Sequence, residues 1–289
     1  MLTVEQIVFS LNQKGKVPAM AINAALTTHK IEIIPALLAV VKNVAENYQY
    51  IDLDDITYLT AMYLLAQLRE PAACQDIIKI ASLYRDWPEK LLGDVITEGL
   101  PRFIVSTYDG NLQNIKNLIE HTHANLYSRT SALHSLLGLF AINRLSREEI
   151  IDYYMYLLNS PLTTDVEFTE FLINDICSLY PQELYNDAIK FFDNGLINSG
   201  QWAIVHREDL QEALDMGMED CLDKHVYDYK FHLPMENVIK EIAWLYRPSE
   251  EQKLINTSKV GRNCLCPCKS GKKYKKCCFN FQNSDTISF

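Results

Sequence analysis

Residues 55–69 read DITYLTAMYLLAQLR, and their pattern decides the fold class. The apolar side chains recur at three- and four-residue spacing, which places them on one face of an α-helix. Asp54 or Asp55 stands where it can cap the first turn of this helix. The residues of the apolar face are Ile56, Leu59, Met62, Tyr63, Leu65 and Ala66. The stretch therefore predicts an amphipathic helix that packs through one side.

Helices of this kind repeat along the chain. Only 10 glycines and 10 prolines interrupt the 289 residues, and no run alternates apolar and polar residues as a strand would. Five apolar helix centres follow one another at intervals of 35–40 residues, and another apolar helix precedes each. They are Leu37/Leu38, Ile77/Ile78, Ile115, Ile150/Ile151 and Ala188/Ile189. One helix pair cannot bury its apolar face alone, so neighbouring pairs stack. We therefore predict an all-α fold over residues 1–248, an α-solenoid of about five helix pairs, with a helix over residues 234–247 that caps the stack.

Residues 125–138 read NLYSRTSALHSLLG, in which Arg129 precedes the small residue Ala132 and then the pair Leu136 and Leu137. This stretch resembles a helix of a HEAT repeat. The other helix pairs share its spacing and not its residues. The resemblance implies that the helix pairs are HEAT-like.

The chain shows no signal for export or for insertion into a membrane. Its longest nearly continuous apolar stretch, residues 33–41, has nine residues and includes Pro35. A bilayer span needs about 20 apolar residues. The first residues, MLTVEQIVFSLNQKGKV, lack the basic and apolar regions of a signal peptide. We therefore predict a cytoplasmic protein with no membrane span, whose cysteines are metal ligands or core residues rather than disulfides.

Charge and cysteine content separate the last residues from the rest. Residues 253–289 hold eight basic and one acidic side chain, a net charge of +7, whereas the preceding residues hold 19 basic and 36 acidic side chains, a net charge of −17. Five of the eight cysteines lie between residues 264 and 278. Such asymmetry indicates a separate unit. We predict a linker over residues 249–260, a small module over 261–278 and a flexible tail over 279–289.

The module reads GRNCLCPCKSGKKYKKCC over residues 261–278. A tetrahedral zinc ion with Zn–S bonds of ~2.3 Å needs four sulfurs roughly 3.7 Å apart. A Cys-x-Cys turn supplies two thiolates, Ser270-Gly271 lets the chain reverse, and an adjacent cysteine pair supplies two more. The predicted Zn²⁺ ligands are Cys266, Cys268, Cys277 and Cys278. A redox or disulfide role of the same cysteines is the alternative.

These residues resemble the SEC-C motif, the zinc module at the C-terminus of the bacterial translocase motor SecA. The match covers Gly-Arg-Asn at 261–263, Cys-Pro-Cys at 266–268, residues 270–275 and the final cysteine pair. Cys264 stands where the motif has an acid, Leu265 where it has proline, and Lys269 where it has glycine. Cys264 could be an alternative ligand or a free thiol. The whole chain also resembles a bacterial family of unknown function that joins a helical domain to this tail.

No residue pattern of a nucleotide-binding loop, a serine hydrolase or a zinc protease occurs in the chain. Four thiolates leave zinc no open position, so the predicted site is structural. We therefore predict a non-catalytic interaction protein. In SecA-type proteins this tail contacts a chaperone and the ribosome, so the resemblance implies a protein or ribonucleoprotein partner.

Two other functions stay open. The basic side chains of the module could bind RNA or the ribosome directly, through Lys269, Lys272, Lys273, Lys275 and Lys276. An enzyme with its site in a groove of the solenoid is the other alternative, although no residue pattern supports it.

Smaller groups are interpreted as packing. Tyr153, Tyr154 and Tyr156 are expected to pack between repeats rather than to stack on bases. The cysteines outside the module lie in apolar helical stretches and are expected to be core residues: Cys74, Cys177 and Cys221.

Overall fold

The computed structural model describes residues 2–13, 15–197, 200, 203–229 and 233–246. The chain divides into two compact units, Met1–Asn12 with Pro18–Glu241, and Gln13–Val17 with Ile242–Phe289. Within the described ranges the regular structure is helical, and the one β-bridge joins Tyr84 and Ala124. The predicted boundaries at 248, 260 and 278 lie outside the described residues.

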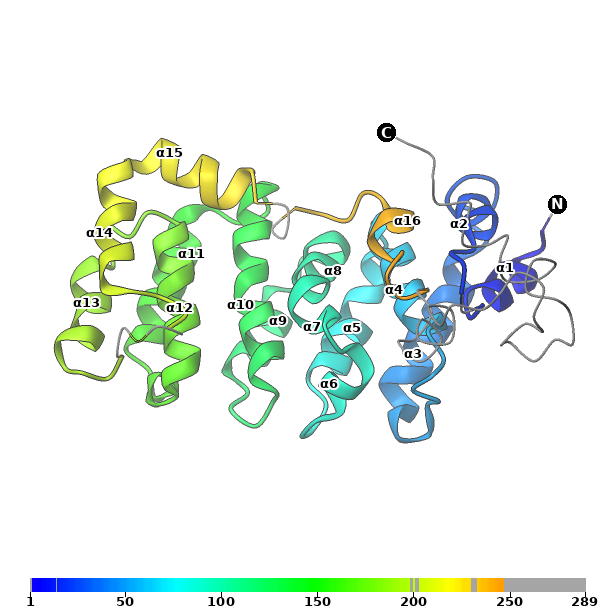
Figure 1. Cartoon of the computed structure of the whole chain (residues 1–289), viewed down its shortest axis with the longest axis horizontal. Coiled ribbons are helices and arrows are strands. Elements are labelled where there is room, and N and C mark those ends of the chain that lie inside the picture. Colours follow the sequence, from blue (N-terminus) through cyan, green and yellow to red (C-terminus); the bar gives the residue numbers. More distant parts are fainter. Residues whose placement is uncertain (1, 14, 198–199, 201–202, 230–232, 247–289) are drawn as a thin grey trace, which may run out of the picture. The chain divides into compact units, whose positions relative to one another are not determined.

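The first unit is a stack of helix pairs arranged in two rows (Figure 1). In the first row each helix contacts the next one along the chain. This row consists of α2 (Ala19–Leu26), α4 (Thr57–Leu68), α8 (Leu100–Thr107), α10 (Leu126–Ala141), α12 (Val166–Ser178) and α14 (Arg207–Met216).

The second row holds the helix that follows each of the first five. It consists of α3 (Ile34–Asn47), α5 (Cys74–Ala81), α9 (Leu112–Glu120), α11 (Arg147–Leu158) and α13 (Tyr185–Asp193). Helix α3 contacts α5, α5 contacts α9, and α11 contacts α13. All five predicted helix centres lie in this row, and a first-row helix precedes each, so the predicted stack of helix pairs is confirmed.

Three helices that precede α14 stand outside the pairs. α1 (Val4–Ser10) precedes the first pair and contacts α2 and α3. α6 (Trp87–Leu92) and α7 (Val95–Glu98) are inserted between α5 and α8, and α7 packs on α8 and α10. The sequence pattern did not distinguish these two short helices from the helix pairs around them.

Helix α4 differs from its predicted form. All of its side chains from Tyr58 to Ala66 are buried, so it is covered on every side rather than on one face. It packs against α3 on one side and against α2 and α8 in its own row. Asp55 accepts a hydrogen bond from the backbone N–H of Thr57 at 2.8 Å and so satisfies a donor in the first turn.

After α14 the chain turns back across the first row. Gly217 ends α14 with φ of 81°, a conformation that favours glycine. We call residues 218–229 and 233–241 the return segment; it contains α15 (Met218–Leu222), a π-helix (Asp223–Tyr227) and α16 (Val238–Glu241). The π-helix contacts α10, and α16 contacts α4 and α2 (Figure 1).

The predicted capping helix over residues 234–247 is therefore mostly wrong. Among the described residues 234–246, only Val238–Glu241 is α-helical, and it packs on α2 and α4 near the start of the stack rather than on the last repeat. In the second unit, the backbone N–H of Gly15 donates to the carbonyl of Tyr246 at 3.2 Å. No helix among the described residues is both long and apolar enough to span a membrane.

Candidate functional sites

The predicted metal ligands lie outside the described residues. This applies to Cys266, Cys268, Cys277 and Cys278, to Cys264, and to the lysines at 269, 272, 273, 275 and 276. In the part of the chain that is described, no group of three His, Cys, Asp or Glu side chains could hold a metal ion. Whether the module binds zinc therefore stays a prediction.

The three described cysteines have the environment of core residues. Cys74 and Cys221 are buried, and Cys177 is half-buried. Burial raises the pKa of all three thiols, to about 11 for Cys74. A thiol with a raised pKa carries little thiolate at neutral pH and is a poor nucleophile or metal ligand.

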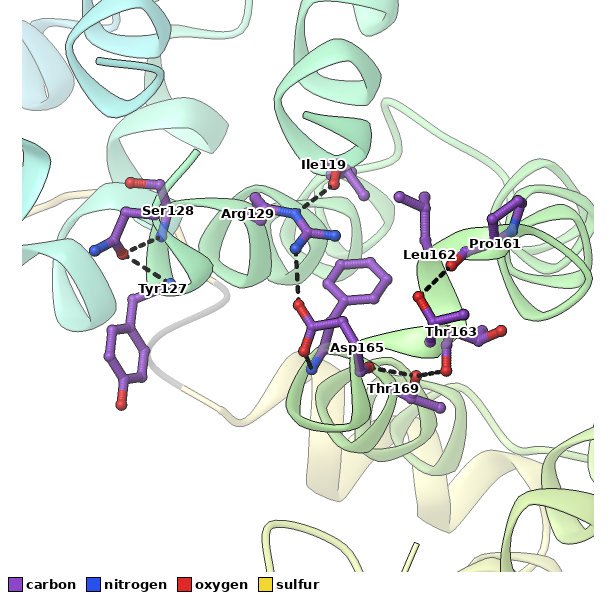
Figure 2. A network of polar contacts seen from close by, with 12 residues as sticks. Ile119, Tyr127, Ser128, Arg129, Pro161, Leu162, Thr163, Asp165 and Thr169 are labelled. Atoms are coloured by element: carbon purple, nitrogen blue, oxygen red, sulfur yellow. Dashed lines mark hydrogen bonds and ion pairs between the residues drawn. The ribbon is translucent and has the colours of Figure 1, made fainter. Parts of the chain in front are cut away.

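A buried arginine joins two repeats. Arg129 on α10 has 3% side-chain exposure; its Nε donates to the carbonyl of Ile119 at the end of α9, and its Nη1 pairs with Oδ2 of Asp165 at 3.0 Å (Figure 2). The guanidinium also lies over the ring of Phe168 at 4.3 Å. Burial lowers the pKa of Arg129, and the carboxylate of Asp165 offsets part of that shift. This arginine therefore ties α9, α10 and the start of α12 together.

Asp165 also begins α12. Its Oδ1 accepts the backbone N–H of Phe168, and its backbone carbonyl accepts the hydroxyl of Thr169, which also lies within hydrogen-bond distance of the Thr163 carbonyl (Figure 2). One carboxylate thus serves as N-cap and as partner of a buried charge. The network is structural, and its arginine belongs to the stretch 125–138 that resembles a HEAT repeat.

A buried carboxylate pairs with a histidine. His134 on α10 places Nδ1 2.6 Å from Oδ1 of Asp175 on α12; the side chains are 23% and 1% exposed. Burial disfavours the imidazolium, but the charge and hydrogen bond of Asp175 outweigh it, so the pKa of His134 is raised above 6.5. Tyr154 of α11 is fully buried near this carboxylate, and both burial and Asp175 raise the pKa of Tyr154.

Stability should depend on the charge of His134. Because its pKa is higher in the folded than in the unfolded chain, its contribution is complete below pH 6.5 and is lost as the pH rises through the folded value. We expect the free energy of unfolding to fall between pH 6 and pH 9 by more in the wild type than in His134→Gln. Urea unfolding of both proteins across this range measures the difference. Equal pH dependence would contradict the pairing.

Three polar side chains of α4 and α8 bond to the return segment, and a fourth, Arg69, supports one of them. Gln67 accepts the backbone N–H of Val238 at 2.8 Å, and Ser106 accepts that of Met235 at 2.8 Å. Arg102 is 6% exposed; it donates to the carbonyls of residues 233 and 234 and pairs with Glu241 at 3.1 Å. Arg69, at the end of α4, donates to Ser106 Oγ at 2.9 Å.

Grooves lie between neighbouring helices of the second row. One of about 610 Å³ runs between α5 and α9, and another of about 570 Å³ runs between α9 and α11. In the latter, Lys116 lies 4.2 Å from the ring centre of Tyr153, whose hydroxyl donates to Glu120. The ring of Tyr156 stacks on that of Tyr153 with 6.0 Å between the ring centres, and Tyr156 is 54% exposed. Tyr153 and Tyr154 are buried as expected for packing, whereas Tyr156 faces the groove.

The motifs and the helical spacing of the sequence do not identify these polar groups. Arg102 lies in LPRFIVST, His134 in SALHSLLG and Asp175 in FLINDICS, and each is the one titratable or charged side chain of an otherwise apolar or small helical run, apart from cysteine. An isolated charge in such a run indicates a buried group with a partner. The partner itself could not be named, because it comes from another repeat.

Two family models match this chain, one over the helical repeats and one over the tail. Stacked helix pairs followed by a SEC-C motif define a helical-repeat protein with a SEC-C tail; the model of that motif matches residues 262–280. The chain belongs to the family described as "Protein of unknown function (DUF1186)", whose model matches residues 2–247. No solved structure matches the chain.

Relatives fall into two groups. An uncharacterized protein of Chlamydia trachomatis is 38% identical over 213 residues, which cover 72% of this chain and 82% of the relative. An uncharacterized protein of Chlamydia muridarum is 36% identical over 215 residues, covering 73% and 84%. The protein translocase subunit SecA of Lawsonia intracellularis is 82% identical over 22 residues, only 8% of this chain and 3% of the relative. The likeness to this SecA is therefore confined to a short stretch.

Proposed function

We propose that the protein is a non-catalytic interaction protein of the cytoplasm, in which a zinc-bound SEC-C tail and a helical-repeat surface bind a protein or ribonucleoprotein partner. The observation that carries the proposal is the SEC-C match over residues 262–280, which includes all four predicted ligands. Four thiolates hold zinc in a closed coordination shell, which favours a structural role for the metal.

Two further observations support this reading. The residues from 253 onward carry a net charge of +7, which suits an acidic or phosphate-bearing partner surface. The second row of helices has open grooves of about 570 and 610 Å³ that can receive side chains of a partner.

The metal site gives the first test. The purified protein should contain one zinc per chain, because the four-thiol pattern occurs once. Cys266→Ser should remove the metal, whereas Cys264→Ser should retain it, since the motif resemblance leaves Cys264 outside the ligand set. Elemental analysis of the two variants measures this. Retention in Cys266→Ser together with loss in Cys264→Ser would mean that the ligand set is wrong.

The partner class can be tested with purified ribosomes. We expect the wild-type protein to sediment with them and Cys266→Ser to remain in the supernatant, because recognition depends on the folded zinc module. The alternative is direct binding of RNA by the lysines of the tail, which depends on charge and falls steeply with salt. Binding that is unchanged in Cys266→Ser but lost when Lys272 and Lys273 become alanine would favour that alternative. No binding by any of the proteins would exclude the ribosome as partner.

A further inference from the structure

We propose that the face formed by Gln67, Arg69, Arg102 and Ser106 is a recognition site for a polypeptide segment that ends in a helical turn. Residues 233–241 of the chain itself fill this site in the structure. A partner segment of the same chemistry would bind by displacing them.

The contacts of the face are mainly to main-chain atoms. Gln67 and Ser106 accept the N–H groups of residues 238 and 235, and Arg102 donates to the carbonyls of residues 233 and 234. Every polypeptide offers these groups before a helix or in its first turn, so the hydrogen bonds recognise unpaired main-chain groups rather than one sequence. Peptide-binding domains divide their task in this way, with main-chain bonds for affinity and side-chain pockets for selectivity.

Side chains of the return segment indicate which partner would fit. Met235 and Val238 are fully buried, which gives two apolar anchors three residues apart. Glu241 pairs with Arg102 at 3.1 Å, three residues after the second anchor. The preferred segment is therefore apolar at its first and fourth positions and acidic at its seventh.

The face is organised by residues outside the return segment. Arg69 adopts a left-handed backbone conformation with φ of 59°, which non-glycine residues rarely adopt. In that conformation its Nη1 reaches both the Ala66 carbonyl and Ser106 Oγ. The acceptor for the Met235 N–H is thus held in place by α4 and α8.

The stack under the return segment is continuous without it. Helix α2 contacts α4, α4 contacts α8, and α8 contacts α10. Residues 233–241 can therefore leave without unstacking the first row. Tethering gives the chain's own segment an effective concentration on the order of millimolar, so an outside segment competes poorly unless that segment is loosened.

The test uses the full chain with its own segment detached. Met235→Asp places a charge at a fully buried anchor and should release residues 233–241. A fluorescent peptide of sequence LPMENVIKE, which copies residues 233–241, should bind this variant saturably and the wild type at least tenfold more weakly. The control peptide LPDENVIKE should not bind. Equal binding of both peptides, or no binding to a variant whose helix content is intact, would overturn the proposal.

A milder variant gives a second measurement that does not depend on the folding of Met235→Asp. Glu241→Gln removes the charge facing Arg102 and leaves both apolar anchors. Adding LPMENVIKE should speed hydrogen exchange at the amides of Met235 and Val238, because the N–H groups of the peptide take over Ser106 and Gln67, the acceptors of these two amides. The same increase in exchange rate should occur at a lower peptide concentration in Glu241→Gln than in the wild type. Unchanged exchange in both proteins at millimolar peptide would also overturn the proposal.

Discussion

Replacing Asp165 with alanine is expected to lower the free energy of unfolding by about 3 kcal/mol. The carboxylate pairs with Arg129, whose side chain is only 3% exposed, and it also caps α12. Its removal leaves a buried cation with the Ile119 carbonyl and the Phe168 ring as remaining partners, and leaves the first turn of the helix uncapped. Urea denaturation followed by far-ultraviolet circular dichroism measures the loss.

The matched control is another aspartate in an ion pair. Asp187 pairs with Lys190 at 2.7 Å, but the lysine is 62% exposed. Asp187→Ala should cost less than about 1 kcal/mol, since water compensates an exposed charge. The loss of unfolding free energy in Asp165→Asn should lie between those of Asp165→Ala and Asp187→Ala, because the amide oxygen can still accept the Phe168 N–H. Similar losses for Asp165→Ala and Asp187→Ala would show that Arg129 does not depend on its partner.

Leu64→Ala should lower the free energy of unfolding by about 3 kcal/mol, within the range for leucine truncation in cores. Leu64 is outside the predicted apolar face of α4, yet it is fully buried. The substitution therefore tests whether α4 is covered on every side. The control is Leu53→Ala at a side chain that is 49% exposed, where a change of about 0.5 kcal/mol is expected. A small loss of stability in Leu64→Ala would instead support the predicted helix that is buried on one face only.

Helix spacing predicted the two rows because it depends on contacts between neighbouring repeats. Ile77, Ile115 and Ile150 recur with the repeat and are buried in α5, α9 and α11. The return segment could not be predicted in this way. Its partners lie in repeats formed much earlier in the chain, and its backbone is bonded by side chains such as Gln67 and Ser106 that have no periodicity.

The candidate sites also differ in how far the sequence predicts them. The SEC-C ligands are close together in the sequence, so the motif alone suggested Cys266 and its partners, and the match over residues 262–280 supports the motif. The pair of His134 and Asp175 brings together residues 41 positions apart, on different helices. Only the stacking of α10 on α12 shows which charges meet.

The return segment also affects the order in which the domain can fold. Bonds between repeats, such as Arg129 with Asp165, join residues 36 positions apart, whereas Arg102 with Leu233 and Gln67 with Val238 join residues 131 and 171 positions apart. Short-range contacts form quickly, and contacts that close long loops form more slowly. Helix pairs can therefore assemble from any point of the array, but α16 can dock only after α4 and α8 are stacked. The slowest kinetic phase of refolding should report this docking, which gives a repeat array the late, cooperative step of a globular domain.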